Sequence, residues 1–126
     1  MATKTFITDM DGKTVDASAV SKPSDRHFRG AWKLSSDSKV IAEDMTKAKE
    51  IFKDKIREVR KPLLEAEDVV YMKALEADDA SAKTASVNKK KALRDAPAAS
   101  AINSADTIAK LKAAWDTSTL GTSPYA

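Results

Sequence analysis

The stretch MTKAKEIFKDKIREVRKPLLEAEDVVYMKALEA, Met45–Ala77, decides the fold because its apolar residues recur at the period of an α-helix. Steps of three or four residues separate the members of one stripe, which are Met45, Ala48, Phe52, Ile56, Val59, Leu63, Ala66, Val70, Ala74 and Ala77. A second, neighbouring stripe holds Leu64, Tyr71 and Leu75. This spacing predicts one long amphipathic helix.

Local signals mark the ends of this helix. Asp44 is a natural N-cap, because its carboxylate can accept the unpaired N–H groups of the first turn. Asp78-Asp79 should end it, since acidic side chains are unfavourable at a helix C-terminus and favourable at the next N-terminus. Pro62 interrupts the pattern while the apolar phase continues across it, which predicts a kink or two helices nearly in line.

The residues after Asp79 predict shorter helices that fold back on the long one. Ala82–Ala96 is rich in helix formers, and Pro97 should stop that helix. A short helical turn at Ala98–Asn103 would then precede a last helix, capped by Asp106. That helix carries Ile108, Leu111 and Trp115. We therefore expect a helical hairpin whose later helices cover the apolar stripe of the first.

The N-terminal part lacks any sustained period and is rich in Ser, Thr, Asp and Lys. Phe6 and Ile7 could begin a short strand, Asp11-Gly12 is a turn signal, and Lys39–Ala42 could form another strand. The predicted fold is mainly α. It comprises an extended arm with short β or turn segments at residues 1–42, a helical hairpin domain at 43–115 and an irregular tail at 116–126.

Composition excludes several classes of protein. A chain of 126 residues suffices for one domain, and 22 basic against 19 acidic side chains leave a formal charge of only +3. There is no cysteine, hence no disulfide or thiol chemistry. No apolar run approaches the length of about 20 residues that a membrane helix needs, and Met1–Met10 lacks the apolar segment of a signal peptide. No membrane partner is expected.

Nothing in the sequence predicts catalysis, a cofactor or a metal site. His27 is the single histidine, and a metal centre needs several convergent ligands, so we expect His27 to be a surface or partner-contact residue. Asp9-Met10-Asp11-Gly12 resembles the start of a calcium loop, but Val20 stands where such a loop needs its bidentate acid. The chain is therefore predicted not to be an enzyme.

Nucleic-acid binding is the main alternative from another class. Lys89-Lys90-Lys91 with Arg94 forms one basic patch, and the bases between Lys47 and Lys61 form another. The second group is interleaved with Glu50, Asp54 and Glu58, which is typical of a solvated helix face. The first has no aromatic residue nearby on which bases could stack. Nucleic acid is consequently not expected as a partner.

An aromatic and basic cluster in the N-terminal part predicts a protein interface. Phe28 and Trp32 lie among Arg26 and Arg29, and large aromatics and arginines are typical anchors at interfaces. The alternative, that the two aromatics fold back onto the helices, stays open at this point. Arg57 and Arg60 are further candidates if they face outward, whereas Trp115 is expected in the core.

Several runs resemble a family of small bacteriophage proteins encoded among tail and tail-fibre genes. The runs are DMTKAKEI at Asp44–Ile51, KIREVRKPLL at Lys55–Leu64, DVVYMKALEA at Asp68–Ala77 and LRDAP at Leu93–Pro97. The likeness covers about Phe28 to Trp115 and includes the closing Ala- and Leu-rich helix. Its motifs are helical, and none is a catalytic signature.

The resemblance implies a non-enzymatic structural protein of the virion tail, present in the host cytoplasm during assembly. Its partners would be other phage structural proteins, such as a tail fibre, an adaptor or the tail tube, with a homo-oligomer in a symmetric ring as a further form. Docking would bury the aromatics, and arginines would donate hydrogen bonds to partner carbonyls and carboxylates. The alternatives are a tail-fibre assembly chaperone that is absent from the mature virion, and a nucleic-acid-binding packaging factor.

Overall fold

The structure is a computed structural model that describes residues 5–125. It divides into two compact units, of which the first ends at Ile51 and the second begins at Phe52. This division falls inside the long helix rather than after residue 42, where the sequence pattern changes.

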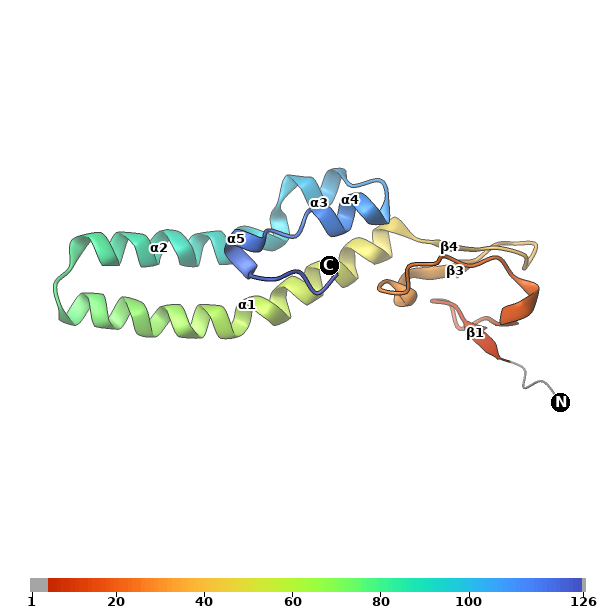
Figure 1. Ribbon diagram of the computed structural model, residues 1–126, viewed down its shortest axis with the longest axis horizontal. Helices are drawn as coiled ribbons and strands as arrows, with labels where there is room; N and C mark the ends of the chain where they lie inside the picture. Colours follow the sequence, from red (N-terminus) through yellow and green to blue (C-terminus); the bar gives the residue numbers. More distant parts are fainter. Residues whose placement is uncertain (1–4, 126) are drawn as a thin grey trace. The chain divides into compact units, whose positions relative to one another are not determined.

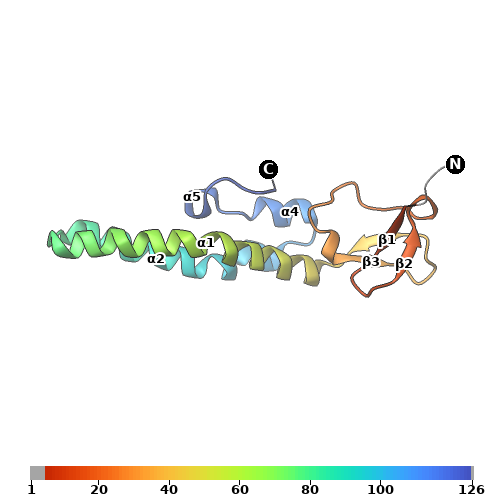
Figure 2. The same ribbon diagram turned by 90° about the horizontal axis from the view of Figure 1, so that it is seen from below.

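The N-terminal unit contains two small antiparallel hairpins. Strands β1 (Phe6–Thr8) and β2 (Thr14–Asp16) pair with Ile7 opposite Val15, and β3 (Trp32–Leu34) and β4 (Ile41–Glu43) pair with Lys33 opposite Ala42. Figure 2 shows β1 and β2 side by side. Two 3₁₀ turns, η1 (Ala17–Ala19) and η2 (Arg29–Ala31), lie between the hairpins. The strands predicted to begin at Phe6 and to lie near Lys39–Ala42 are confirmed as β1 and β4, whereas their partners β2 and β3 were not predicted.

The hairpins enclose a small apolar core. Trp32, Leu34 and Ile41 are buried together, and Ile7, Val15 and Val20 pack against them partly buried. Because strand side chains alternate between faces, Trp32 and Leu34 lie on one face of β3 while Lys33 between them is exposed.

Helix α1 (Met45–Glu76) is a single helix of 32 residues that passes unbroken through Pro62. Asp44 caps it as predicted, since its Oδ1 accepts the N–H of Lys47 at 3.1 Å. Figure 1 shows the helix axis bending in its yellow-green part, the stretch that contains Pro62. Of the two predicted alternatives, the chain therefore adopts the kinked single helix.

Helix α2 (Ala80–Asp95) runs back beside α1, and the two form a hairpin in both views (Figures 1 and 2). Asp78 takes a positive φ of 51° in the reversal, and Asp79 caps α2 by accepting the N–H of Ala82 at 3.1 Å. The predicted mainly α hairpin with its turn at Asp78-Asp79 is confirmed.

The inner face of α1 departs from the predicted stripe beyond Leu63. Glu67 is buried with 6% of its surface exposed, whereas Ala66, Val70 and Ala77 are exposed. The prediction that Ala66 and Val70 face the core was wrong. The reason is that α2 offers a polar surface here, so the carboxylate of Glu67 turns inward to meet it.

The chain ends in short helices, two details of which correct the predictions. They are η3 (Ala96–Ala98), α3 (Ser100–Ser104), α4 (Ile108–Ala113) and α5 (Thr117–Leu120). Thr107, not Asp106, caps α4 by accepting the N–H of Lys110 at 3.2 Å. The segment predicted to be an irregular tail contains α5, because the carboxylate of Asp116 accepts the N–H groups of Ser118 and Thr119.

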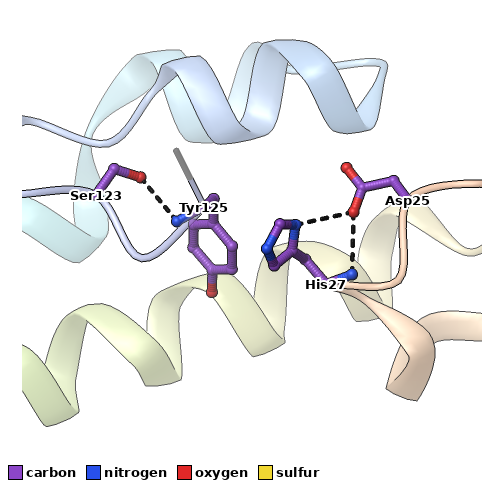
Figure 3. A network of polar contacts seen from close by, with 4 residues as sticks. All are labelled: Asp25, His27, Ser123 and Tyr125. Atoms are coloured by element: carbon purple, nitrogen blue, oxygen red, sulfur yellow. Dashed lines mark hydrogen bonds and ion pairs between the residues drawn. The ribbon is translucent and has the colours of Figure 1, made fainter.

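Three aromatic rings close the core of the second unit. The rings of Phe52 and Tyr125 stack with centroids 5.5 Å apart, and Trp115 meets both edge-on at 5.8 and 6.0 Å. The N–H of Tyr125 donates to the Ser123 hydroxyl at 3.1 Å (Figure 3), which fixes the bend before the ring. Trp115 is in the core, as predicted.

Candidate protein-binding surfaces

Phe28 and Trp32, the predicted aromatic anchors, are buried in the chain itself. Phe28 has no exposed surface and Trp32 has 3%. Trp32 belongs to the core of the N-terminal unit, together with Leu34 and Ile41. Of the two interpretations that the sequence left open, an intramolecular place is the one that the structure shows, and neither ring is available for docking as an exposed anchor.

Arg26 and Arg29, by contrast, are exposed and line a pocket of about 430 Å³. Its other walls are β1 with the preceding Thr5, then Gly30 and an edge of Trp32. Neither guanidinium has an ion-pair partner among residues 5–125. The pocket therefore presents two uncompensated positive charges beside a short strand.

Trp32 also contains a buried polar atom without a partner. Its Nε1 is shielded from solvent and has no hydrogen-bond acceptor in the described part of the chain. A buried donor without an acceptor costs about 1–3 kcal/mol. The N-terminal unit carries this cost at a residue that also lines the arginine-lined pocket.

His27 takes part in a local turn. The Oδ1 of Asp25 accepts the backbone N–H of His27 at 3.0 Å and lies 3.0 Å from its Nδ1 (Figure 3). This pattern is an Asx turn, in which an aspartate side chain orders the backbone two residues on. No group of three or more His, Cys, Asp or Glu side chains within residues 5–125 could hold a metal ion.

Arg57 and Arg60, the two other predicted interface residues, differ in environment. Arg57 is exposed and pairs with Asp54 one turn earlier, with 2.8 Å between Nη1 and Oδ1. Arg60 is half-buried and donates from Nη1 to the carbonyl oxygens of Leu93 at 3.4 Å and Arg94 at 2.8 Å. Through these bonds Arg60 joins α1 to the end of α2. A partner contact for either arginine stays a prediction.

The distal half of the hairpin, residues 67–90, is held together by polar contacts. Glu67 pairs with Lys89 at 3.5 Å, Asp68 pairs with Lys90 at 2.6 Å, and the Ser86 hydroxyl donates to the Glu67 carbonyl at 3.3 Å. The Nζ of Lys90 also lies 4.9 Å from the centroid of the Tyr71 ring. Two lysines of the predicted basic patch thus neutralise acids of α1.

The large aliphatic side chains of this half are exposed instead, although Ala74 is buried. Val69, Met72 and Leu75 are 54%, 53% and 47% exposed, and they follow one another at steps of three along one side of α1. Val70 and Val87 are also about half exposed, at 48% and 47%. We call Val69, Met72 and Leu75 the distal ridge. A helical hairpin in water usually buries its apolar side chains and exposes its polar ones. In this half, Glu67 and Ser86 are buried while the distal ridge is exposed.

Sequence reasoning missed the distal ridge because the apolar stripes that it recognised on this helix include neither Val69 nor Met72. A signal was nevertheless present. Glu67 and Ser86 lie at positions where a wholly apolar seam would need hydrophobic residues, and both acids at 67–68 have lysine counterparts at 89–90. Pairing the acids at 67–68 with the lysines at 89–90 would have placed Glu67, and not Ala66, on the face of the first helix that packs against the second.

Among residues 5–125, no helix has the length and apolarity to cross a bilayer. No family model, curated protein or solved structure matched the chain in the three comparisons. The resemblance to small phage tail proteins consequently stays a prediction, and the surfaces above are interpreted from their own chemistry.

Proposed function

We propose that this chain is a non-enzymatic structural protein that works by docking on other proteins, as a tail component of a bacteriophage virion. The observation that carries the docking proposal is the distal ridge. About half of the surface of Val69, Met72 and Leu75 meets water while Glu67 and Ser86 occupy the seam.

The physical argument concerns what the exposed side chains would gain from a partner. Each buried Å² of apolar surface contributes about 25 cal/mol, so a ridge of three large side chains gains several kcal/mol when a partner covers it. Clustered exposed apolar residues at helical spacing are typical of a helix that lies in a hydrophobic groove. The likeness of Asp44–Ala77 and Leu93–Pro97 to phage proteins supports the tail as the place of docking.

Mass spectrometry of salt-washed particles of the source phage tests this proposal. A small, fixed copy number relative to the major capsid protein is expected for a structural component. Absence from the particles, with the chain found on newly made fibre protein, would show that it is an assembly chaperone instead.

A matched pair of variants tests the ridge itself. Val69→Ser with Met72→Ser and Leu75→Ser should lower incorporation into particles while leaving the isolated chain folded, because all three side chains are exposed. The control is Ala66→Ser with Ala77→Ser, two exposed positions outside the ridge, of which Ala66 lies in α1 and Ala77 directly follows it. Equal incorporation of both variants would refute docking through the ridge.

A further inference from the structure

The outer edge of β1 carries backbone groups that no strand pairs. Thr5 and Asp9 bond towards β2, through the Ala17 N–H to the Thr5 carbonyl at 2.8 Å and the Asp9 N–H to the Lys13 carbonyl at 2.9 Å. Because alternate residues of an antiparallel strand bond to opposite sides, Phe6 and Thr8 direct their N–H and C=O groups away from β2. No backbone bond within residues 5–125 closes this edge at Phe6 or Thr8.

The same edge of the first hairpin forms a backbone hydrogen bond at Met10, two residues after Thr8. The N–H of Met10, which has the same parity as Phe6 and Thr8, donates to the carbonyl of Trp32 at 2.7 Å. The backbone on this side of the first hairpin is therefore at a geometry that accepts an extended partner. Beside Phe6 and Thr8, the arginine-lined pocket lies where such an extended partner would bind.

The charge of the pocket defines the chemistry of its occupant. Arg26 and Arg29 supply the charged side chains of its lining, and both are exposed and without an ion-pair partner among the described residues. Guanidinium groups bind carboxylates through paired, charge-assisted hydrogen bonds. A bound strand presents every second side chain to one face, so acids at alternate positions would face the two arginines.

We propose that the edge of β1 binds an extended, acidic segment of a partner protein, which adds a strand beside Phe6 and Thr8 and places its carboxylates against Arg26 and Arg29. Main-chain hydrogen bonds supply affinity in this mode of recognition, and the side-chain contacts supply specificity. The proposal concerns the N-terminal unit and does not depend on the distal ridge or on a phage tail.

The test is a nuclear magnetic resonance titration of the full, ¹⁵N-labelled chain with a short peptide of alternating valine and glutamate. We expect saturable shifts at the Phe6 and Thr8 amides and at the indole N–H of Trp32. The indole of Trp115, which lies in the second unit and donates to the Gly121 carbonyl at 3.1 Å, is the internal control.

The variant Arg26→Gln with Arg29→Gln should weaken binding by about tenfold or more, because each lost charge-assisted bond is worth about that factor. Lys22→Gln with Lys33→Gln is the matched control, since it removes the same charge from exposed residues of the same unit outside the pocket. It should bind the peptide like the natural chain.

Three results would overturn the proposal. One is the absence of shifts at Phe6 and Thr8, and another is equal binding of a peptide of alternating valine and lysine. The third is the same set of shifts with single-stranded oligothymidylate, which would identify the pocket as a phosphate site. Normal incorporation of the ridge variant into particles would refute docking through the ridge and leave this titration unchanged, so the two proposals fail separately.

Discussion

The carboxylate of Asp9, at the turn of the first hairpin, accepts the backbone N–H of Leu34 in β3 at 2.9 Å. Its other oxygen accepts the N–H groups of Asp11 at 3.0 Å and Lys13 at 2.8 Å. One buried side chain thus orders its own turn and ties the first hairpin to the second. Asp9 is therefore the polar centre of the N-terminal unit, a role that its sequence context did not predict.

Acid should loosen the N-terminal unit through Asp9. The bond from Leu34 most strongly lowers the pKa of the Asp9 carboxyl below its ordinary 3.8, with burial acting in the opposite sense. A pKa lowered by folding stabilises the fold above the unfolded value of about 3.9 and stops doing so as the pH falls through the folded value. The protection factor of the Leu34 amide against hydrogen exchange should fall over that range. Asp9→Asn should show fast exchange already at neutral pH, and Asp11→Asn should not.

Replacing Trp32 should destabilise the N-terminal unit in proportion to the volume removed. Trp32→Ala empties the centre of the Trp32, Leu34 and Ile41 cluster, and the expected cost of about 3–5 kcal/mol should unfold so small a core. Trp32→Phe should cost less, because it also removes the unpaired Nε1 donor. Dispersion of the amide signals of Leu34 and Ile41 reports the outcome. An ordered unit in Trp32→Ala would contradict the assignment of Trp32 to the core.

Arg60→Ala should destabilise the hairpin by about 2 kcal/mol, because it removes the charged donor shared by two carbonyl oxygens at the end of α2. Arg57→Ala removes an exposed ion pair on the same helix and should change the free energy of unfolding by less than about 1 kcal/mol. Urea unfolding, followed by helix circular dichroism, compares the two. Equal effects would mean that Arg60 contributes no more than a surface charge.

Pro62→Ala should stabilise the second unit. Pro62 is exposed inside α1, where proline removes a hydrogen bond and is about 3 kcal/mol less favourable than alanine. A gain of about 1–3 kcal/mol in urea unfolding is expected, with a straighter helix. Lys61→Ala, at the adjacent exposed position, is the control. No gain would indicate that contacts elsewhere in the unit require the bend.

Tyr125→Ala should destabilise the second unit by about 3 kcal/mol, since it removes a buried ring that meets Phe52 and Trp115. Pro124→Ala, next to it and exposed, should have little effect. Burial raises the pKa of the Tyr125 hydroxyl above 10.0, and Glu58 adds to this rise. A raised pKa stabilises the fold below the unfolded value and stops doing so above the folded one. Alkaline unfolding should therefore be less steep in Tyr125→Phe.

The ends of the helices could be predicted because each depends on residues that are neighbours in the chain. Asp44 caps α1 and Asp79 caps α2 through carboxylates that reach an N–H only three residues on. The cap of α4 was assigned one residue early, to Asp106 instead of Thr107. Polar residues adjacent to a helix start compete for this role, and sequence alone does not rank them.

The candidate surfaces could be predicted only in part. Arg26 and Arg29, which were predicted to lie in a protein interface, are exposed and line a pocket, whereas the neighbouring Phe28 and Trp32 are interior residues. Aromatic residues occur both in interfaces and in cores. Trp32 lies in a core because its strand pairs with β4, which brings Ile41 against it. The distal ridge could not be predicted by periodicity, because Ala66 and Glu67 each continue a helical stripe after Leu63.

The sequence by itself determined the two long helices, their caps, the reversal at Asp78-Asp79 and the places of β1 and β4, since these depend on interactions within a few residues. Only the tertiary structure decided that Glu67 faces α2, that Tyr125 joins Phe52 and Trp115, and that Asp9 binds Leu34. These contacts join residues far apart in the chain. Their free energy depends on which surface packing brings opposite each side chain, and local propensity carries no information about that choice.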